Sequence, residues 1–209
     1  MQPIQAALAA LWPEAEPVNL LDDALSLDRS REDALTEAMI ERFVAFGTYG
    51  YRTGADGILV TCSAFGPAID ALAAAVPVPV LKPNEAMFQA AIERGGRIGM
   101  LATFGPSVGT MTDEWNDFVG QGGSAAKLDT LLVADAIDLL KRGDADSHNR
   151  LVAARAPEFA GHDAIMLAHF STSRAADAVR GVVDVPVLTA PDAAVSRMRA
   201  LVEGRQSLQ

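Results

Sequence analysis

Two stretches of the chain have matching sequences, and each ends in a side chain that can transfer a proton. Residues 54–62 read GADGILVTC and residues 161–169 read GHDAIMLAH, at a spacing of 107. The register continues without a gap through a shared Pro-Val-Leu. In this register Cys62, the only cysteine, is opposite His169. Because thiols and imidazoles both serve as acids and bases, the repeat indicates proton transfer at a site between two related halves.

Each candidate also has a structural interpretation. Cys62 lies between a short apolar strand and a helix, where free N–H groups favour a thiolate that acts as base or nucleophile. The alternative is a small buried apolar cysteine. His169 is either a general acid or a structural histidine at a domain interface. The hydroxyls of Ser63, Thr103 and Ser107 either hold a carboxylate together with helix N–H groups or only cap helices.

Composition excludes several classes of function. The 209 residues carry a net charge of −10, and half of them are apolar. A general nucleic-acid or anionic-membrane binder needs clustered cations, and no apolar run reaches the roughly 20 residues of a membrane span. With one cysteine and no signal-like N-terminus, we expect a soluble cytoplasmic protein. The histidine and glycine spacings fit neither a metal site nor a dinucleotide site, so neither a metal nor a dinucleotide is expected.

Short apolar strands that alternate with helices would position these side chains. They are typical of parallel sheets covered on both faces, and right-handed crossovers give two doubly wound halves. Cys62, Asn84, Thr103, His169 and Asp192 lie at or beyond predicted strand ends, where ligands bind in such folds. Strands are predicted over residues 57–61, 78–81, 97–102, 127–133, 164–168 and 185–189, with a further extended run at 17–21. Helices are predicted over residues 4–11, 31–49, 66–75, 84–94, 106–118, 134–142, 147–156, 173–180 and 191–203.

Five motifs follow one another along nearly the whole chain: VTCSA, PVLKPNEA, IGMLATFGPSV, DAIMLAHFSTS and PVLTAPDAA. Together they resemble the aspartate/glutamate racemase superfamily, which includes hydantoin, aspartate and glutamate racemases, maleate isomerase and arylmalonate decarboxylase. The resemblance implies two pseudo-symmetric α/β halves with the active site in the cleft between them. It also implies catalysis without a cofactor, and a homodimer.

The resemblance assigns roles to individual residues. Cys62 matches the first catalytic cysteine of the family, and Ser63 the polar residue beside it. At the second catalytic position the racemases commonly have Leu-Gly-Cys or Leu-Ala-Cys, whereas this chain has His169 after Leu-Ala. A two-thiol racemase is therefore excluded, and His169 becomes the candidate second acid or base. The expected substrate-binding residues are Ser63, Ala64, Asn84, Thr103, Ser107, Phe170 and Ser171, of which Thr103 and Ser107 match carboxylate-binding hydroxyl residues of the family.

The expected reaction removes a weakly acidic proton next to a carboxylate or carbonyl, with N–H donors stabilising the enolate. Cys62 and His169 would act on opposite faces of a small amino acid, hydantoin or dicarboxylate, as in a racemase or isomerase. One alternative is a single-cysteine decarboxylase of a malonate-like acid, although arylmalonate decarboxylase resembles this chain with its cysteine at the other position. Another alternative is a catalytically silent homologue that binds small acids.

The repeat also predicts the domain organisation. The first half would comprise residues 1–95 with the C-terminal helix at about 191–209, and the second half residues 96–190. The strand at 97–102 has its counterpart upstream of Met1, so we expect the first sheet to lack one strand, with unpaired N–H and C=O groups. Either the natural start lies roughly ten residues earlier, or another segment or a partner chain fills the place.

Overall fold

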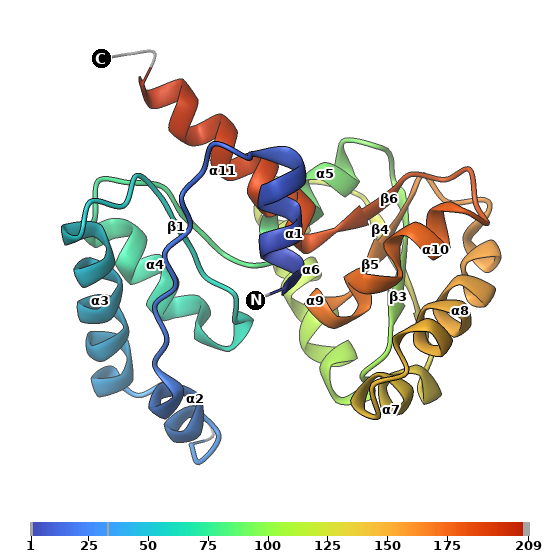
Figure 1. Ribbon diagram of the computed structural model, residues 1–209, viewed down its shortest axis with the longest axis horizontal. Helices are drawn as coiled ribbons and strands as arrows, with labels where there is room; N and C mark the ends of the chain where they lie inside the picture. Colours follow the sequence, from blue (N-terminus) through green and yellow to red (C-terminus); the bar gives the residue numbers. More distant parts are fainter. Residues whose placement is uncertain (1, 33, 207–209) are drawn as a thin grey trace. The chain divides into compact units, whose positions relative to one another are not determined.

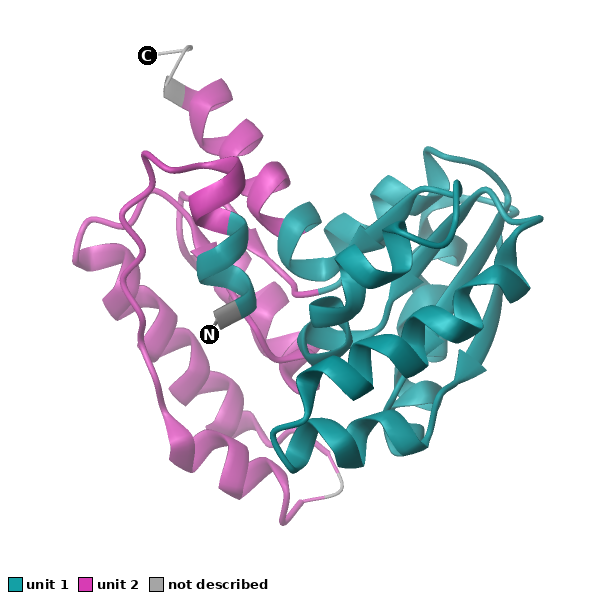
Figure 2. Cartoon of the chain, turned by 45° about the vertical axis from the view of Figure 1, so that its right-hand side comes forward, with its two compact units in different colours: residues 1–7, 84–193 teal, residues 8–83, 194–209 magenta. Residues whose placement is uncertain are grey.

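The structure is a computed structural model that describes residues 2–32 and 34–206. Figure 1 labels the helices and strands that these residues form. They group into two compact units, which Figure 2 shows in different colours. Unit 1 contains residues 2–7 and 84–193, and unit 2 contains the described residues of 8–83 and 194–206. Helices α1 (Gln2–Leu11) and α11 (Ala190–Gln206) pass from one unit to the other.

Unit 1 is built on a four-stranded parallel sheet. The strand order is β4-β3-β5-β6, with β3 (Arg97–Ala102) and β5 (Ala164–Leu167) at the centre and β4 (Lys127–Leu132) and β6 (Val187–Thr189) at the edges. Apart from the exposed Arg97 at the start of β3, the residues of the two central strands are apolar or glycine and are buried on both faces. The helices of unit 1 are α5 (Glu85–Ile92), α6 (Val108–Gly122), α7 (Asp135–Lys141), α8 (Ala145–Arg155), α9 (His169–Thr172) and α10 (Ala176–Arg180), with short 3-10 turns η2 (Gly105–Ser107), η3 (Ala156–Phe159) and η4 (Ser173–Ala175).

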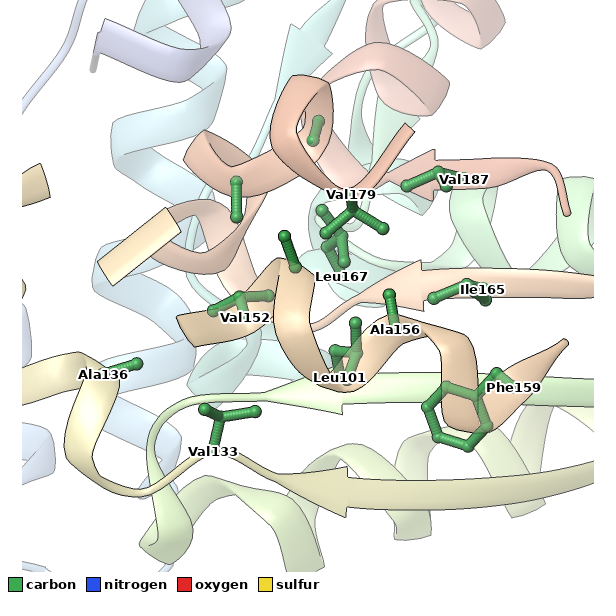
Figure 3. Packing of buried hydrophobic residues seen from close by; sticks show 13 residues of the cluster. Leu101, Val133, Ala136, Val152, Ala156, Phe159, Ile165, Leu167, Val179 and Val187 are labelled. Carbon is green, nitrogen blue, oxygen red and sulfur yellow. The ribbon is translucent and has the colours of Figure 1, made fainter. Parts of the chain in front are cut away.

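Alternate side chains of the central strands enter two cores on opposite faces of the sheet. Leu101 and Leu167 lie in the core covered by α8, η3 and α10, which Figure 3 shows. Met100 and Met166 lie in the other core, covered by α5 and α6. Each fully buried side chain of this kind contributes about 1.5–3 kcal/mol. The two cores therefore hold β3 and β5 firmly, and the residues that follow these strands start from fixed positions.

Unit 2 has a two-stranded parallel sheet, β1 (Ile58–Leu59) and β2 (Val80–Leu81). Its helices are α2 (Asp23–Arg29), α3 (Glu37–Arg52) and α4 (Gly66–Ala75), preceded by the 3-10 turn η1 (Ser63–Phe65). The core of unit 2 gathers Phe43 of α3, Phe65, and Leu72 of α4, with Ile58 and Val80 of the strands packed against it. The rings of Phe43 and Phe65 stack at a centroid distance of 5.4 Å.

The parallel α/β architecture expected from the sequence is confirmed. The strand predicted over residues 97–102 is β3, and the helix predicted over 66–75 is α4. Most other elements end within one to three residues of their predicted bounds. The halves defined by the repeat stay a prediction, because residues 84–95 group here with unit 1. Met1 and the last three residues of the C-terminal segment lie outside the described residues.

The helix predicted over residues 31–49 is wrong at its start. Helix α3 begins at Glu37, because the Thr36 hydroxyl accepts the N–H of Met39 and caps the helix there. Helix α2 was not predicted from the sequence, although the Asp22 carboxylate caps it in the same way. Both caps use a short polar side chain, which apolar periodicity does not register.

The described residues of the first sheet form the two strands β1 and β2. Within the described residues β1 pairs with β2 alone, whereas its counterpart β5 pairs on both sides. Residues 17–21 adopt no strand pairing. Of the described helices, none combines the length and apolar character needed to cross a membrane.

Candidate active site

His169 begins helix α9 directly after the buried strand β5. Its φ of 65° lies in the left-handed region, and among the described residues it is the one non-glycine residue with a positive φ. The preceding Ala168 N–H donates to the carbonyl of Leu101 at 2.9 Å, so the backbone is fixed up to this point. A left-handed conformation costs about 1–3 kcal/mol outside glycine, and strain of this kind gathers at functional sites.

Ser107 holds the His169 ring. The Nε2 atom of His169 is within hydrogen-bonding distance of the Ser107 hydroxyl, and that hydroxyl donates to the carbonyl of Phe104 at 2.8 Å. Because the serine proton is used for Phe104, the serine oxygen accepts the Nε2–H of His169. The neutral ring then keeps its free lone pair on Nδ1, which is the atom able to accept a proton.

Burial acts on the same ring. It lowers the pKa of His169 from its ordinary value of 6.5, because a partly desolvated imidazole favours its neutral form. Neutral His169 with its proton on Nε2 is prepared to act as a base through Nδ1. The pKa shift and the Ser107 hydrogen bond therefore favour the same protonation state.

Thr103, which follows β3, is fully buried. Its hydroxyl lies 3.1 Å from that of Thr172 at the end of α9. This contact connects the carboxyl end of β3 to the helix that begins at His169. The structure thus gives Thr103 a role in anchoring α9, and its predicted contact with a carboxylate stays a prediction.

Asn84 stands at the start of α5 and is also buried. Its amide nitrogen donates to Glu114 of α6 at 2.7 Å and lies 3.2 Å from the sulfur of Met111. Both amide protons are therefore directed at α6, and the amide oxygen is the atom left to meet a ligand. The sequence analysis selected Asn84 but missed Glu114. The sequence of the helix that carries Glu114 does not show which strand end the helix faces.

The remaining residues expected in unit 1 follow His169 in α9. Phe170 and Ser171 are both half-buried. Phe170 packs against the core that contains Met166, and its carbonyl accepts the hydroxyl proton of Ser173. His169, Ser107, Thr103 and Thr172 thus form one connected group at the carboxyl ends of β3 and β5, which is where parallel sheets bind ligands.

The candidate thiol belongs to unit 2. Cys62 is exposed and precedes η1 with an extended backbone, at φ −128° and ψ 120°. Ser63 is half-buried and Ala64 is exposed. Because Cys62 is exposed, its interpretation as a small buried apolar residue is wrong. The approach of Cys62 to His169 stays a prediction.

The described side chains offer no metal centre. Within residues 2–32 and 34–206, no three His, Cys, Asp or Glu side chains are grouped as metal ligands would be. His162 bonds to Asp129 at 2.8 Å, and His148 is buried with its Nδ1 2.8 Å from the Asn149 side chain. Neither hydrogen bond involves the group around His169.

Solved structures with the same fold include several racemases. A glutamate racemase from Bacillus anthracis is 14% identical with a TM-score of 0.67, covering 98% of this chain and 78% of its own. An allantoin racemase from Klebsiella pneumoniae is 20% identical with a TM-score of 0.63, covering 98% and 82%. A Gly74Cys mutant of arylmalonate decarboxylase is 17% identical with a TM-score of 0.59, covering 80% and 76%.

At the level of sequence, no curated protein matches this chain significantly. The family described as Asp/Glu/Hydantoin racemase, however, matches residues 1–117, which is more than half of the chain and includes Cys62, Asn84, Thr103 and Ser107. The fold, the strand-end group around His169 and this match agree with one another. This chain belongs to the Asp/Glu/Hydantoin racemase family.

Proposed function

We propose that this protein is a cofactor-independent racemase or isomerase that moves a proton next to the carboxylate or carbonyl of a small amino acid, hydantoin or dicarboxylate. It would act as a homodimer in the cytoplasm. The observation that carries the proposal is His169. Its imidazole stands on a strained backbone at the end of β5 and is held by Ser107 in a tautomer that leaves Nδ1 free. The repeat pairs this residue with the exposed thiol of Cys62.

In the proposed reaction, each turnover moves one proton in and one proton out. Neutral His169 removes the substrate proton through Nδ1, the resulting carbanion spreads its charge onto the adjacent carboxylate or carbonyl, and the Cys62 thiol delivers its proton to the opposite face. The enzyme is left with a thiolate and an imidazolium, which run the reverse direction or exchange protons with water. Both groups serve as acid and as base, as racemisation in two directions requires.

Binding of the substrate is proposed to involve the predicted residues in two different ways. Ser63 and Ser171 are half-buried and have hydroxyls able to meet a carboxylate, and Asn84 offers its amide oxygen. Ala64 and Phe170 would shape the space around the substrate. Ser107 and Thr103 are already bonded within unit 1, so we assign them to positioning His169 and α9.

A decarboxylase of a malonate-like acid is the second candidate, because the chain has a single cysteine and shares its fold with the arylmalonate decarboxylase mutant. In that reaction the Cys62 thiol would protonate the enediolate after carbon dioxide leaves. His169 would then be dispensable for proton transfer, so the two candidate reactions differ in whether they need His169.

One panel separates the candidates. The protein is incubated in heavy water with amino acids, hydantoins and malonates, and the α-proton is followed by NMR, with the Cys62→Ser variant as the matched control. Exchange of the α-proton with loss of optical purity supports the racemase. Release of carbon dioxide supports the decarboxylase. Thermal stabilisation by a ligand without exchange or carbon dioxide release would show a binding protein and contradict the proposed activity.

A further inference from the structure

The side chain of Asn84 is held in one orientation by helix α6. Its amide nitrogen donates to the Oε2 atom of Glu114 at 2.7 Å and lies 3.2 Å from the sulfur of Met111. A carboxylate has no proton to donate, so the group of Asn84 that faces Glu114 is the NH2 and not the oxygen. Asn84 is only 4% exposed, and a hydrogen bond to a charged acceptor is about twice as strong as a neutral one. Glu114 therefore sets the orientation of the amide.

The oxygen of the same amide is left for a ligand. Among the described residues, no hydrogen bond is directed at this oxygen. The described side-chain atoms that are enclosed without a partner are Arg29 Nε, His148 Nε2 and His162 Nδ1, so the Asn84 oxygen is not shut inside the core. A fixed acceptor of this kind selects a ligand that brings a donor, because any other ligand leaves the acceptor unpaired.

The position of Asn84 on α5 provides a second, independent observation. Asn84 is the N-cap residue of α5, and asparagine is favoured there because its side-chain oxygen accepts the free N–H groups of the first turn. The Asn84 side chain makes no such hydrogen bond. Its oxygen thus forgoes the capping interaction that this residue type normally provides. A role of the oxygen outside α5 accounts for that loss.

Helix α6 connects this amide to the group around His169. Ser107, which is bonded to the His169 ring, stands directly before α6, and Met111 and Glu114 follow it after four and seven residues. Residues at these intervals share one face of an α-helix, within about 60° of one another, and Met111 lies about 6 Å along the axis from Ser107. The partners of the imidazole and of the Asn84 amide therefore lie on the same face of α6, one to two turns apart.

We propose that Glu114 is a positioning residue of the candidate active site, which holds the Asn84 amide so that its oxygen accepts an N–H group of the substrate. Amino acids and hydantoins have such a group next to the reacting carbon, whereas malonates and dicarboxylates without nitrogen lack it. The inference rests on the proposed function and deepens it, since it names the substrates that the site prefers.

A double-mutant cycle tests the contact between Asn84 and Glu114. In Asn84→Asp two carboxylates face each other, so the unfolding temperature should fall. In the double variant Asn84→Asp/Glu114→Gln the new amide donates to the new carboxylate, and the net charge equals that of the wild type. The double variant should therefore recover at least about half of the lost unfolding temperature. If it recovers nothing, the proposed contact is overturned.

The selectivity for an N–H group is measured by titration calorimetry with three pairs of racemic probes. The pairs are glutamate and glutarate, aspartate and succinate, and 5-methylhydantoin and 1,5-dimethylhydantoin. The wild type should bind the N–H member of a pair at least about tenfold more tightly. In Glu114→Gln this preference should fall below about threefold, because an amide partner both donates and accepts and no longer fixes the orientation of Asn84.

Two proteins should keep the preference. One is the double variant, because position 84 again presents an oxygen to the substrate. The other is Asp113→Asn, which removes an exposed carboxylate from the next position of α6. A purely structural role of Glu114 would change the unfolding temperature but not the ratio of the two dissociation constants.

The outcomes separate this inference from the proposed function. Exchange of the α-proton in heavy water by the wild type tests the proposed function without reference to Glu114. Exchange together with an equal preference in the wild type and Glu114→Gln would overturn the inference alone. Tighter binding of the probes without an N–H group would also overturn it. If the wild type neither binds nor exchanges any probe, the proposed function and the inference are both overturned.

Discussion

At the scale of single residues, the proposed chemistry depends on two side chains that the sequence aligns but that occur in different local environments. Cys62 is exposed on an extended backbone. His169 is half-buried on a left-handed backbone and bonded to Ser107. The histidine is therefore held in one geometry and one tautomer, while the thiol is left accessible. Three predictions follow from this difference.

Replacement of Cys62 by serine should lower turnover at least about 100-fold, because a hydroxyl is far less acidic than a thiol and proton transfer by a positioned group contributes about 10²–10⁴-fold. Since Cys62 is exposed, the free energy of unfolding should change by no more than about 0.5 kcal/mol. Steady-state kinetics and urea unfolding measure the two effects. Near-normal turnover in the Cys62→Ser protein would exclude the proposed role of the thiol.

The backbone strain at His169 should appear as a difference in the free energy of unfolding between two variants that both lack the imidazole. At φ 65° alanine keeps the steric cost of a side chain, whereas glycine adopts this conformation freely. His169→Gly should therefore unfold with a free energy about 1 kcal/mol higher than His169→Ala. Turnover should be impaired to a similar extent in both. Urea titration measures the difference, and equal stabilities would show that the left-handed backbone is not strained.

The lowered pKa of His169 makes the stability of the protein depend on pH. The folded protein protonates this ring at a lower pH than the unfolded chain does, so on acidification the unfolded chain takes up the proton first. The contribution of His169 is fully present above the unfolded pKa near 6.5 and is lost as the pH falls through the lower folded value. Urea unfolding between roughly pH 5 and 8 should show the wild type losing more stability than His169→Asn. A parallel loss in the two proteins would contradict this.

At the scale of elements, close packing of η3 against β3 keeps the carboxyl end of the central sheet in place. Gly99 of β3 lies under the Phe159 ring, and a Cβ added at Gly99 would be 2.6 Å from the Phe159 Cγ atom. The strand leads directly to Thr103 and Ser107, which anchor α9 and His169. A shift of β3 would therefore also move the residues of the candidate site that follow this strand.

Gly99→Ala should destabilise the protein by about 1–3 kcal/mol, because the ring and the helical turn behind it must move. Gly109→Ala is the matched control: a Cβ at this residue of α6 would meet nothing within 4 Å, so stability should stay unchanged or rise by up to about 1 kcal/mol. Thermal unfolding of the two variants measures the difference. Equal unfolding temperatures of the two variants would show that the Phe159 ring moves aside without loss of stability.

At the scale of the whole molecule, the proposed reaction needs Cys62 and His169 on two sides of one small substrate. The chain provides a direct test because it has no other cysteine. In His169→Cys, a short bismaleimide should join residues 62 and 169 within one chain, and a carboxylate substrate should slow the reaction. Val182→Cys is the control, because Val182 is exposed and precedes β6, at the end of the sheet opposite to His169. Peptide mapping identifies the linked residues, and equal cross-linking in both variants would contradict a shared site.

The sequence by itself determined the strands, the parallel architecture and the family. Apolar runs such as AIML and IGMLA indicate strands because a strand buried on both faces consists almost wholly of apolar residues, and the repeat indicated which residues correspond. It also selected Cys62 and His169.

Only the tertiary structure decided what each site residue touches. The Ser107 hydroxyl lies within hydrogen-bonding distance of the His169 ring and Thr103 is buried against Thr172, while the expected contacts of both hydroxyls with a carboxylate stay predictions. No pattern in the sequence indicated Glu114, which lies on another helix and accepts a hydrogen bond from Asn84. Hydrogen bonds between residues 30 to 69 positions apart depend on the direction in which each chain segment leaves the sheet. That direction is set by the packing of helices on the two cores and not by the local pattern of residues.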